Sequence, residues 1–374
     1  MTRALPTISE RGVDVTSRGP RPLARSLRAA LAVAVVAGAA AGCAGEQPLP
    51  APRPQQVQAP APAVPADRAS AVHEEVEEAV AAADAAGDAA LLAPRVTGSA
   101  EEVRAARYRL RQIQEDAPAP APLGGDVLRD VVPAIGVPGA EEGESPERAT
   151  SPAEATATFP RTWLTITQAP QEQAPQLSVL VQPDARSPYR VESTVGLLPG
   201  AVVPPVAAPE QGAAPVDPSS AEGLALSPQD AVAQYAATLT DPAAPEAAAF
   251  ADDAFRQEVL AERDEADAVE FFALETTRTP RPETVRAVAT ADGGALVVGV
   301  LDSRSVQTVE EEGAVLQLPE PVATLAGRPD APERLEQHWL EVVALSVPPA
   351  DGSGQPAQVQ AVGADRVLLE AAAL

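Results

Sequence analysis

The sequence predicts an α+β protein with two small domains, in each of which helices pack on a curved antiparallel sheet. Each half of the chain begins with amphipathic helical segments and continues with alternating, β-rich segments. A second observation limits the regular structure, because 41 prolines and 24 glycines in 374 residues interrupt helices and strands. We therefore expect a disordered, proline- and alanine-rich N-terminus and linkers around the two domains.

The first 42 residues have the order of a secretion signal. Six arginines come before the uncharged apolar stretch 29–42, which ends in small residues directly before Cys43, the single cysteine of the chain. These 14 apolar residues would make a helix of about 21 Å, shorter than the roughly 30 Å needed to span a bilayer. The sequence therefore predicts a signal peptide over residues 1–42.

The small residues before Cys43 resemble the lipobox of bacterial lipoproteins, although the usual Leu is replaced by Ala40. The resemblance implies cleavage before Cys43 and attachment of diacylglycerol to its sulfur. Two acyl chains would hold the protein on the extracytoplasmic face of the cell membrane. Ordinary cleavage near Ala41 and an uncleaved anchor are the alternatives.

Residues 43–67 follow as a tether in which proline recurs every two to four positions. Such a segment favours an extended polyproline-type chain, which at about 3.1 Å per residue could reach roughly 70 Å from the lipid surface. A stalk and a featureless disordered leader are both consistent with this composition.

We place the first domain at residues 68–198, beginning with two helices. The first has a stripe of apolar residues at helical spacing, namely Val72, Val76, Val80 and Ala83. The second opens on a capping box, Ser99 with Glu102, and continues with Val103, Ala106, Leu110 and Ile113. Its arginines, which include Arg104, are expected to form solvated pairs with the acidic flank of the first helix, and an anion site is the alternative.

Residues 115–156 are rich in proline and glycine and are predicted to form an irregular insertion in this domain. Three strands of a meander follow at residues 158–168, 176–182 and 189–198, which are rich in β-branched and aromatic residues. The next segment, 199–226, has the composition of an interdomain linker.

The second domain, 227–374, repeats the order of helices and strands. Ser227 caps a helix with Pro228 in its first position, and Val232, Tyr235 and Leu239 form its buried stripe. A second helix is expected over 246–271, with Phe250, Phe255 and Val259 turned inward. Strands are expected over 283–290, 295–310, 335–347 and 358–372, with a tight turn at 292–294.

Three short strings, FADDAFRQ (250–257), LLAPRVTG (91–98) and SPYRV (187–191), resemble uncharacterised lipoproteins of actinobacteria, whose mature part is a domain of unknown function. This resemblance covers residues 67–372. The order of helices and sheet is also similar to the cystatin-like and NTF2-like folds. Neither resemblance implies an activity, since such folds serve enzymes and binding modules alike.

Candidate chemistry is sparse. His73 and Glu77 share a helix face at metal-ligand spacing, but they supply only two ligands, and a solvated acidic face is the preferred interpretation. His338 is the other histidine, and placement in the core or on the sheet surface is favoured over a general base. The acidic runs at 252–253, 264–267 and 310–312 lack the spacing of a calcium loop and are expected to be hydrated surface.

An NTF2-like cone could use Tyr or Asp as acid and base in an apolar pocket. Tyr189, Tyr235 and Asp253 are of the right type, but the sequence does not bring them together. Trp163 and Trp339 are expected to be core anchors. Motifs for nucleotides, serine hydrolases and zinc proteases do not occur in the sequence.

The formal net charge of −26 disfavours nucleic acids as partners, because it repels phosphate backbones. We therefore expect a protein that contacts the membrane through the lipid on Cys43 and has a non-enzymatic binding or scaffolding role in the envelope, without a cofactor. An envelope protein or a cell-wall component would be its partner. The alternative is a small-ligand carrier or an enzyme with an NTF2-like pocket, and a spacer without a ligand is a third possibility.

Overall fold

A computed structural model describes residues 61–374, except for 115–116, 118, 136–158, 169–173 and 351–356. The predicted signal peptide, most of the predicted tether and Cys43 lie outside the described residues. Within the described ranges, no helix is both long enough and apolar enough to cross a membrane.

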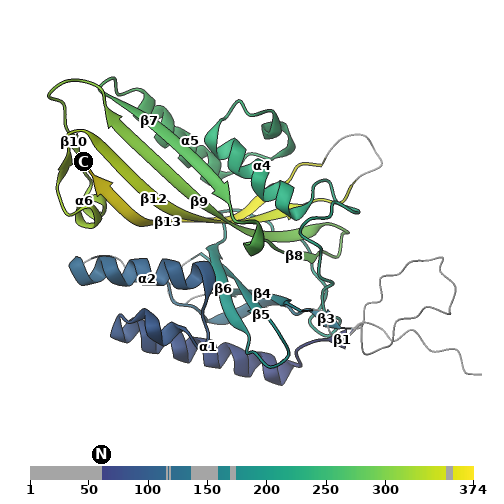
Figure 1. Ribbon diagram of the computed structural model, residues 1–374. Coiled ribbons are helices and arrows are strands. Elements are labelled where there is room, and N and C mark those ends of the chain that lie inside the picture. Colours follow the sequence, from purple (N-terminus) through teal and green to yellow (C-terminus); the bar gives the residue numbers. More distant parts are fainter. Residues whose placement is uncertain (1–60, 115–116, 118, 136–158, 169–173, 351–356) are drawn as a thin grey trace, which may run out of the picture. The chain divides into compact units, whose positions relative to one another are not determined.

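The four-stranded N-sheet has the antiparallel order β2-β4-β5-β6, and Figure 1 labels its strands β4, β5 and β6. Its strands are β2 (Asp126–Val131), β4 (Arg161–Gln168), β5 (Gln176–Gln182) and β6 (Arg190–Gly196). The predicted three-strand meander corresponds to β4, β5 and β6. The prediction of an irregular insertion is wrong for β2, whose exposed edge position explains why it lacks the alternation of a half-buried strand.

Two helices precede the N-sheet. In α1 (Ala66–Ala86) the four residues of the predicted stripe are all buried. The helix ends at Gly87, whose φ of 62° is the left-handed conformation that favours glycine. The tether prediction is wrong for residues 61–67, because β1 (Ala61–Pro62) pairs with β3 (Ala134–Ile135) and α1 has already begun.

The second helix, α2 (Gly98–Ile113), follows the short 3₁₀ turn η1 (Ala89–Leu92) and differs from its prediction in two ways. The capping box is absent, because the helix starts at Gly98 and the Ser99 hydroxyl donates to the carbonyl oxygen of Glu192 in β6 instead, over 3.1 Å. The buried face is also rotated, so that Ile113 is 64% exposed while Arg104 and Tyr108 are buried. Both of these side chains donate to the carboxylate of Asp84 in α1, which explains the rotation.

The five-stranded C-sheet has the antiparallel order β13-β12-β9-β7, with β8 paired to β9. Its strands are β7 (Phe272–Pro280), β8 (Arg286–Ala289), β9 (Ala295–Val309), β12 (Arg334–Val347) and β13 (Gln360–Ala373). The strand predictions for 295–310, 335–347 and 358–372 are confirmed by β9, β12 and β13. Near the outer end of the sheet lie three short elements, β10 (Leu316–Gln317), α6 (Glu320–Ala326) and β11 (Asp330–Ala331).

Two helices cover one face of the C-sheet. In α4 (Pro228–Thr240) the Ser227 hydroxyl accepts from the backbone N–H of Asp230, as predicted. This helix approaches the sheet closely, because a Cβ at Gly299 of β9 would lie 2.6 Å from Val232. The predicted helix 246–271 is wrong as one element. It divides into η3 (Pro245–Ala249), an extended Phe250 and α5 (Ala254–Asp267), because Pro245 and the cap Asp253 each start a new turn.

The C-sheet and the N-sheet face each other across one shared hydrophobic core. With a side-chain period of two, alternate residues of the C-sheet point to α4 and α5 or to the N-sheet. One buried cluster combines residues of both sheets: Leu164, Ile166, Leu177 and Val179 with Val298, Val300, Leu340 and Val342. The opposite face of the N-sheet packs on α1 through Trp163 and Leu180. The layers are therefore α4 with α5, the C-sheet, the N-sheet and α1.

The two predicted domains lie within one compact unit, Gln55–Leu374. The predicted linker 199–226 is bonded to both sheets, since the Arg129 guanidinium of β2 donates to the carbonyl oxygen of Pro204 and the backbone N–H of Val216 donates to Ala287 of β8. The mixed α+β class is shown, and the division into two domains stays a prediction. Limited proteolysis near residues 200–225 would test it.

Candidate functional site

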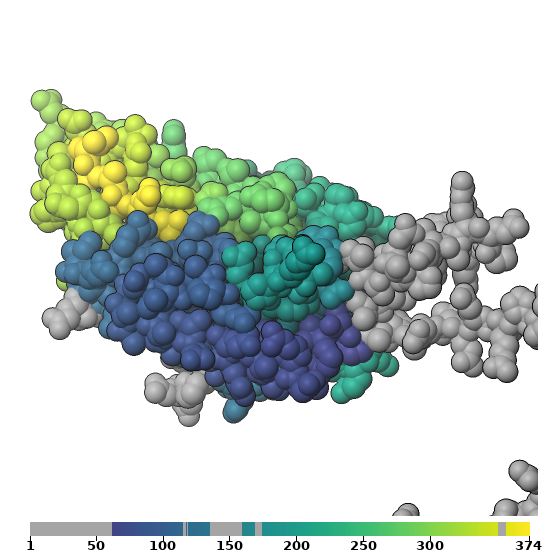
Figure 2. Space-filling view, turned by 60° about the horizontal axis from the view of Figure 1, so that its bottom comes forward, coloured from purple at the N-terminus to yellow at the C-terminus, as the bar shows by residue number. Residues whose placement is uncertain are grey.

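A groove lies between α2, the end of α1 and the strands β12 and β13. It has a volume of about 700 Å³ and adjoins a second recess of about 400 Å³. Four residues line both parts: Arg109, His338, Leu369 and Glu370. We call the two together the α2–β13 groove. In Figure 2 the blue surface of the second helix meets the yellow surface of the last strand along this boundary.

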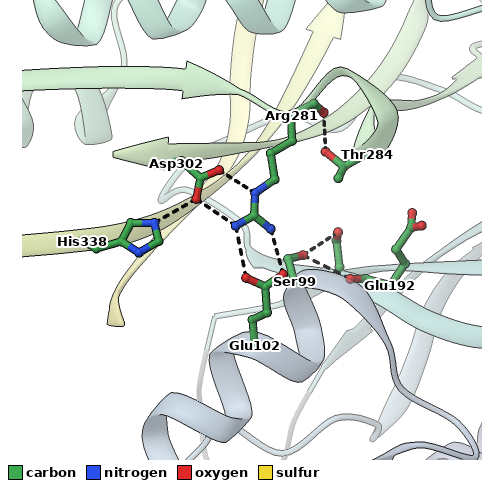
Figure 3. A network of polar contacts seen from close by, with 8 residues as sticks. Ser99, Glu102, Glu192, Arg281, Thr284, Asp302 and His338 are labelled. Atoms are coloured by element: carbon green, nitrogen blue, oxygen red, sulfur yellow. Dashed lines mark hydrogen bonds and ion pairs between the residues drawn. The ribbon is translucent and has the colours of Figure 1, made fainter. Parts of the chain in front are cut away.

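A network centred on Arg281 lies beside the groove. Arg281 follows the end of β7, and its guanidinium donates to both oxygens of Glu102 in α2 at 2.7 and 3.1 Å. It also donates to both oxygens of Asp302 in β9 at 2.7 and 2.8 Å (Figure 3). One arginine thus joins the first helical pair to the C-sheet by two bidentate contacts, the strongest geometry for such pairs.

His338 extends the network to the groove wall. Its Nε2 lies 2.9 Å from Asp302 Oδ1 (Figure 3). The hydrogen bonds from Arg281, more than that of His338, outweigh burial and lower the pKa of Asp302 to about 2. The same contacts with Asp302 and Glu102 raise the pKa of Arg281. The carboxylate and the guanidinium therefore remain charged at neutral pH, and they fix the orientation of the imidazole.

A second ion pair crosses between the sheets. Arg286 of β8 donates to Glu192 of β6 over 2.7 Å. Burial raises the pKa of Glu192 despite the opposing attraction of Arg286. The backbone carbonyl of Glu192 also accepts from Ser99, and the Ser99 Oγ lies 2.7 Å from that of Ser193 (Figure 3). These contacts hold α2 against β6.

His73 is part of a different cluster. Its Nε2 lies 3.2 Å from Asp130 of β2, and the Trp163 indole donates to the same carboxylate oxygen over 3.1 Å. Burial acts to raise the pKa of Asp130, but the hydrogen bonds and charge of these partners lower it overall. Glu77 does not join them, because it accepts from the backbone N–H of Gly125. Among the described residues, no group of three or more His, Cys, Asp or Glu is placed to hold a metal ion.

Of the three acid–base candidates, the structure brings two together. The Tyr235 hydroxyl donates to Asp253 over 3.0 Å, and burial followed by the negative charge of Asp253 raises the pKa of Tyr235. The same carboxylate oxygen caps α5 by accepting from Arg256 N–H. Tyr189 lies elsewhere, edge-on to Trp163 at 5.6 Å. The Tyr235–Asp253 pair therefore links α4 to the start of α5.

The remaining candidates have mixed outcomes. Trp163 is fully buried, which confirms it as a core anchor. Trp339 is only half-buried, and the Arg366 guanidinium lies over its ring at 4.9 Å. The acidic run 310–312 is exposed as predicted, and so is Asp252, which pairs with Arg256, whereas Asp253 is half-buried and caps α5.

The sequence alone does not mark Arg281, Asp302 and Glu102 as a site. Their one signal is that Asp302 interrupts the apolar run of β9, and this signal alone does not name its partners.

A family model described as a domain of unknown function, DUF8094, matches residues 144–371. The chain belongs to this family. The DUF8094 match includes β4 to β6 and almost the whole C-sheet, so both sheets contribute to the family's domain. Arg281, Asp302 and His338 lie inside the matched residues, whereas Glu102 and Arg109 of α2 lie before them. Searches of curated proteins and of solved structures gave no significant match.

Proposed function

We propose that this DUF8094 protein is a lipid-anchored binding protein of the cell envelope, held on the extracytoplasmic face through Cys43, and that its role is non-enzymatic. The order of basic, apolar and small residues in positions 1–43 supports export and attachment to the membrane. The helix-then-sheet order of both halves supports the finer proposal that they are cystatin-like or NTF2-like units in an actinobacterial lipoprotein.

The observation that carries the binding role is the α2–β13 groove. Its lining has four carboxylates, Asp88, Glu102, Glu336 and Glu370, against two guanidinium groups, Arg109 and Arg304. Glu102 and Glu336 are paired with Arg281 and Arg334, whereas Asp88 and Glu370 are exposed to solvent. These two exposed carboxylates, in a chain of net charge −26, favour a polar, positively charged segment of an envelope partner.

Binding of short peptides tests the groove directly. A fluorescent Lys/Ser decapeptide is expected to bind the soluble form lacking residues 1–60, and a Glu/Ser decapeptide is not. Ala105→Trp, which fills the groove, and Glu370→Arg, which reverses its charge, should each weaken binding at least tenfold. The matched controls Ala82→Trp and Glu265→Arg change exposed positions outside the groove lining and should have no effect. Equal binding by all variants would contradict the proposal.

Attachment to the membrane through Cys43 is tested separately. We expect Cys43→Ser to release the protein from the membrane fraction and to change its processed mass. An unchanged mass and unchanged membrane association would contradict lipidation.

The alternative function, a small-ligand carrier, is favoured by one specific observation. A cavity of about 140 Å³ lies between α5 and the C-sheet, and much of its lining is polar.

A further inference from the structure

The cavity under α5 occupies a place where a helix packed on a sheet normally buries apolar side chains. It is bounded by Leu239 and Thr240 at the end of α4, by one face of α5, and by neighbouring residues of β7, β9, β12 and β13. Its base is deeply buried, and its outer residues, such as Gln307 and Gln337, are half-buried. The cavity is therefore a pocket with an inner end and an outer end.

The sheet face beneath the pocket changes from apolar to polar residues at the same height in neighbouring strands. On β9 the residues facing the helices are apolar up to Leu301 and then become Ser303, Ser305 and Gln307. On β12 the same face changes from Val343 to Glu341. These positions are adjacent across the strands. On the β12 side, Ser303 pairs with Trp339 and Ser305 pairs with Gln337. On the β7 side, Ser303 pairs with Arg278 and Ser305 pairs with Thr276. Polar residues of three strands thus gather into one patch under α5.

An ion pair closes the inner end. Glu341 is fully buried, the Arg278 side chain is 5% exposed, and Arg278 Nε lies 3.0 Å from Glu341 Oε2. Arg278 Nη1 also donates to the carbonyl oxygen of Leu239 over 2.9 Å. A buried carboxylate needs such a partner, because desolvation without one costs several kcal/mol. The negative charge at the base is therefore already compensated by the protein.

The charges nearer the outer end are compensated in the same way. Arg366 donates to both oxygens of Glu262 at 2.7 and 2.6 Å while covering Trp339. Arg263 donates to the carbonyl oxygen of Thr240 and pairs with Asp267. The lining also has neutral hydroxyls and amides, of which Ser305 donates to Gln337 over 3.4 Å; the five residues are Thr276, Ser303, Ser305, Gln307 and Gln337.

We propose that this pocket binds a small, neutral, polyhydroxylated molecule of about one sugar ring or polyol. Hydroxyl and amide groups match such a ligand, which both donates and accepts hydrogen bonds and brings no net charge. The volume of about 140 Å³ is far more than one water needs but below the roughly 300 Å³ at which drug-sized sites begin. The proposal gives a ligand class to the small-ligand alternative and is independent of the α2–β13 groove.

Ligand-observed NMR on the soluble form lacking residues 1–60 tests the ligand class. Glucose and myo-inositol are the neutral probes, and glucuronate and glucosamine are the charged ones. We expect saturable binding of at least one neutral probe with a Kd of about 1 mM, and at least tenfold weaker binding of both charged probes. Absence of saturable binding by either neutral probe at 50 mM, or glucuronate binding as tightly as glucose, would overturn the proposal.

Two neighbouring threonines of β7 provide a matched pair for locating the site. Thr276 lines the pocket, whereas the next residue, Thr277, is exposed and does not line it. Thr276→Val removes the hydroxyl with little change of shape and should weaken binding of the neutral probe at least fivefold, and Ser305→Ala should act similarly. Thr277→Val should leave binding unchanged. If Thr276→Val and Thr277→Val change the affinity for the neutral probe equally, and the two variants have the same thermal midpoint of unfolding, then any sugar binding lies outside this pocket.

The groove variant Ala105→Trp separates this proposal from the proposed function. It should weaken peptide binding at least tenfold and leave sugar binding intact, so either proposal can fail while the other stands.

Discussion

Arg278 and Arg281 are three residues apart, yet they lie in very different environments. Arg278 points from β7 toward α4, and it and its partner Glu341 are 5% and 0% exposed. Arg281 lies just beyond the end of β7, and it and its partners Glu102 and Asp302 are 21%, 39% and 27% exposed. We expect burial, rather than the number of hydrogen bonds, to decide how much the stability of the fold depends on each arginine.

Removing the buried arginine is expected to have the largest effect. Arg278→Met would leave the Glu341 carboxylate without its charged partner in the interior and should lower the free energy of unfolding by about 3 to 5 kcal/mol. Urea unfolding followed by circular dichroism measures it. The double variant Arg278→Met with Glu341→Leu should recover most of the loss. A double variant as unstable as Arg278→Met alone would show that lost packing, and not the unpaired charge, is responsible.

Removing the half-exposed arginine should cost less, despite its two bidentate contacts. We expect Arg281→Met to lower the free energy of unfolding by about 1 to 2 kcal/mol, because water can solvate Glu102 and Asp302 in its place. The same unfolding experiment measures this. A loss of unfolding free energy equal to that of Arg278→Met would contradict the expected difference between the two arginines. It would indicate that the Arg281 network is more tightly enclosed than its exposed fractions suggest.

The acid range provides a third test of the Arg281 network. The pKa of Asp302 is about 2 in the folded protein, below the value of roughly 3.9 in an unfolded chain. A lowered folded pKa contributes stability that is present above about pH 4 and is lost as the pH falls toward 2. Asp302→Asn should therefore flatten the decline in unfolding free energy between pH 4 and pH 2. A decline identical to that of the parent protein would assign the acid sensitivity to other carboxylates.

An exposed ion pair is expected to have the smallest effect on the free energy of unfolding. Arg334 and Glu336 lie 2.9 Å apart but are 45% and 47% exposed. Arg334→Ala should change the free energy of unfolding by less than about 0.5 kcal/mol, because solvent screens such pairs. A larger loss would suggest that the backbone contacts of Arg334 with Leu374 depend on its side chain.

Features that depend on neighbouring residues could be predicted from the sequence. The stripe of α1, the cap at Ser227 and the strand β5 all arise from patterns within a few positions, and the structure confirms them. The error over residues 246–271 is of the same local kind, because Pro245 and the cap at Asp253 are local signals that divide this segment.

The candidate site could not be predicted in this way, because its partners are far apart in the chain. Arg281 and Glu102 are 179 residues apart, and Arg278 and Glu341 are 63 residues apart. Nothing in the local pattern distinguishes these charges from those on solvated surfaces. The rotated face of α2 has the same origin, since Arg104 and Tyr108 are buried by bonding to Asp84 of another helix.

The shared core of the two sheets has a consequence for biosynthesis. The N-sheet residues Leu164, Leu177 and Val179 are covered by strands that come more than a hundred residues later. A chain that emerges with its N-terminus first must therefore keep this face from aggregating until β9 and β12 have arrived. We expect truncated products ending before residue 295 to need a chaperone to stay in solution.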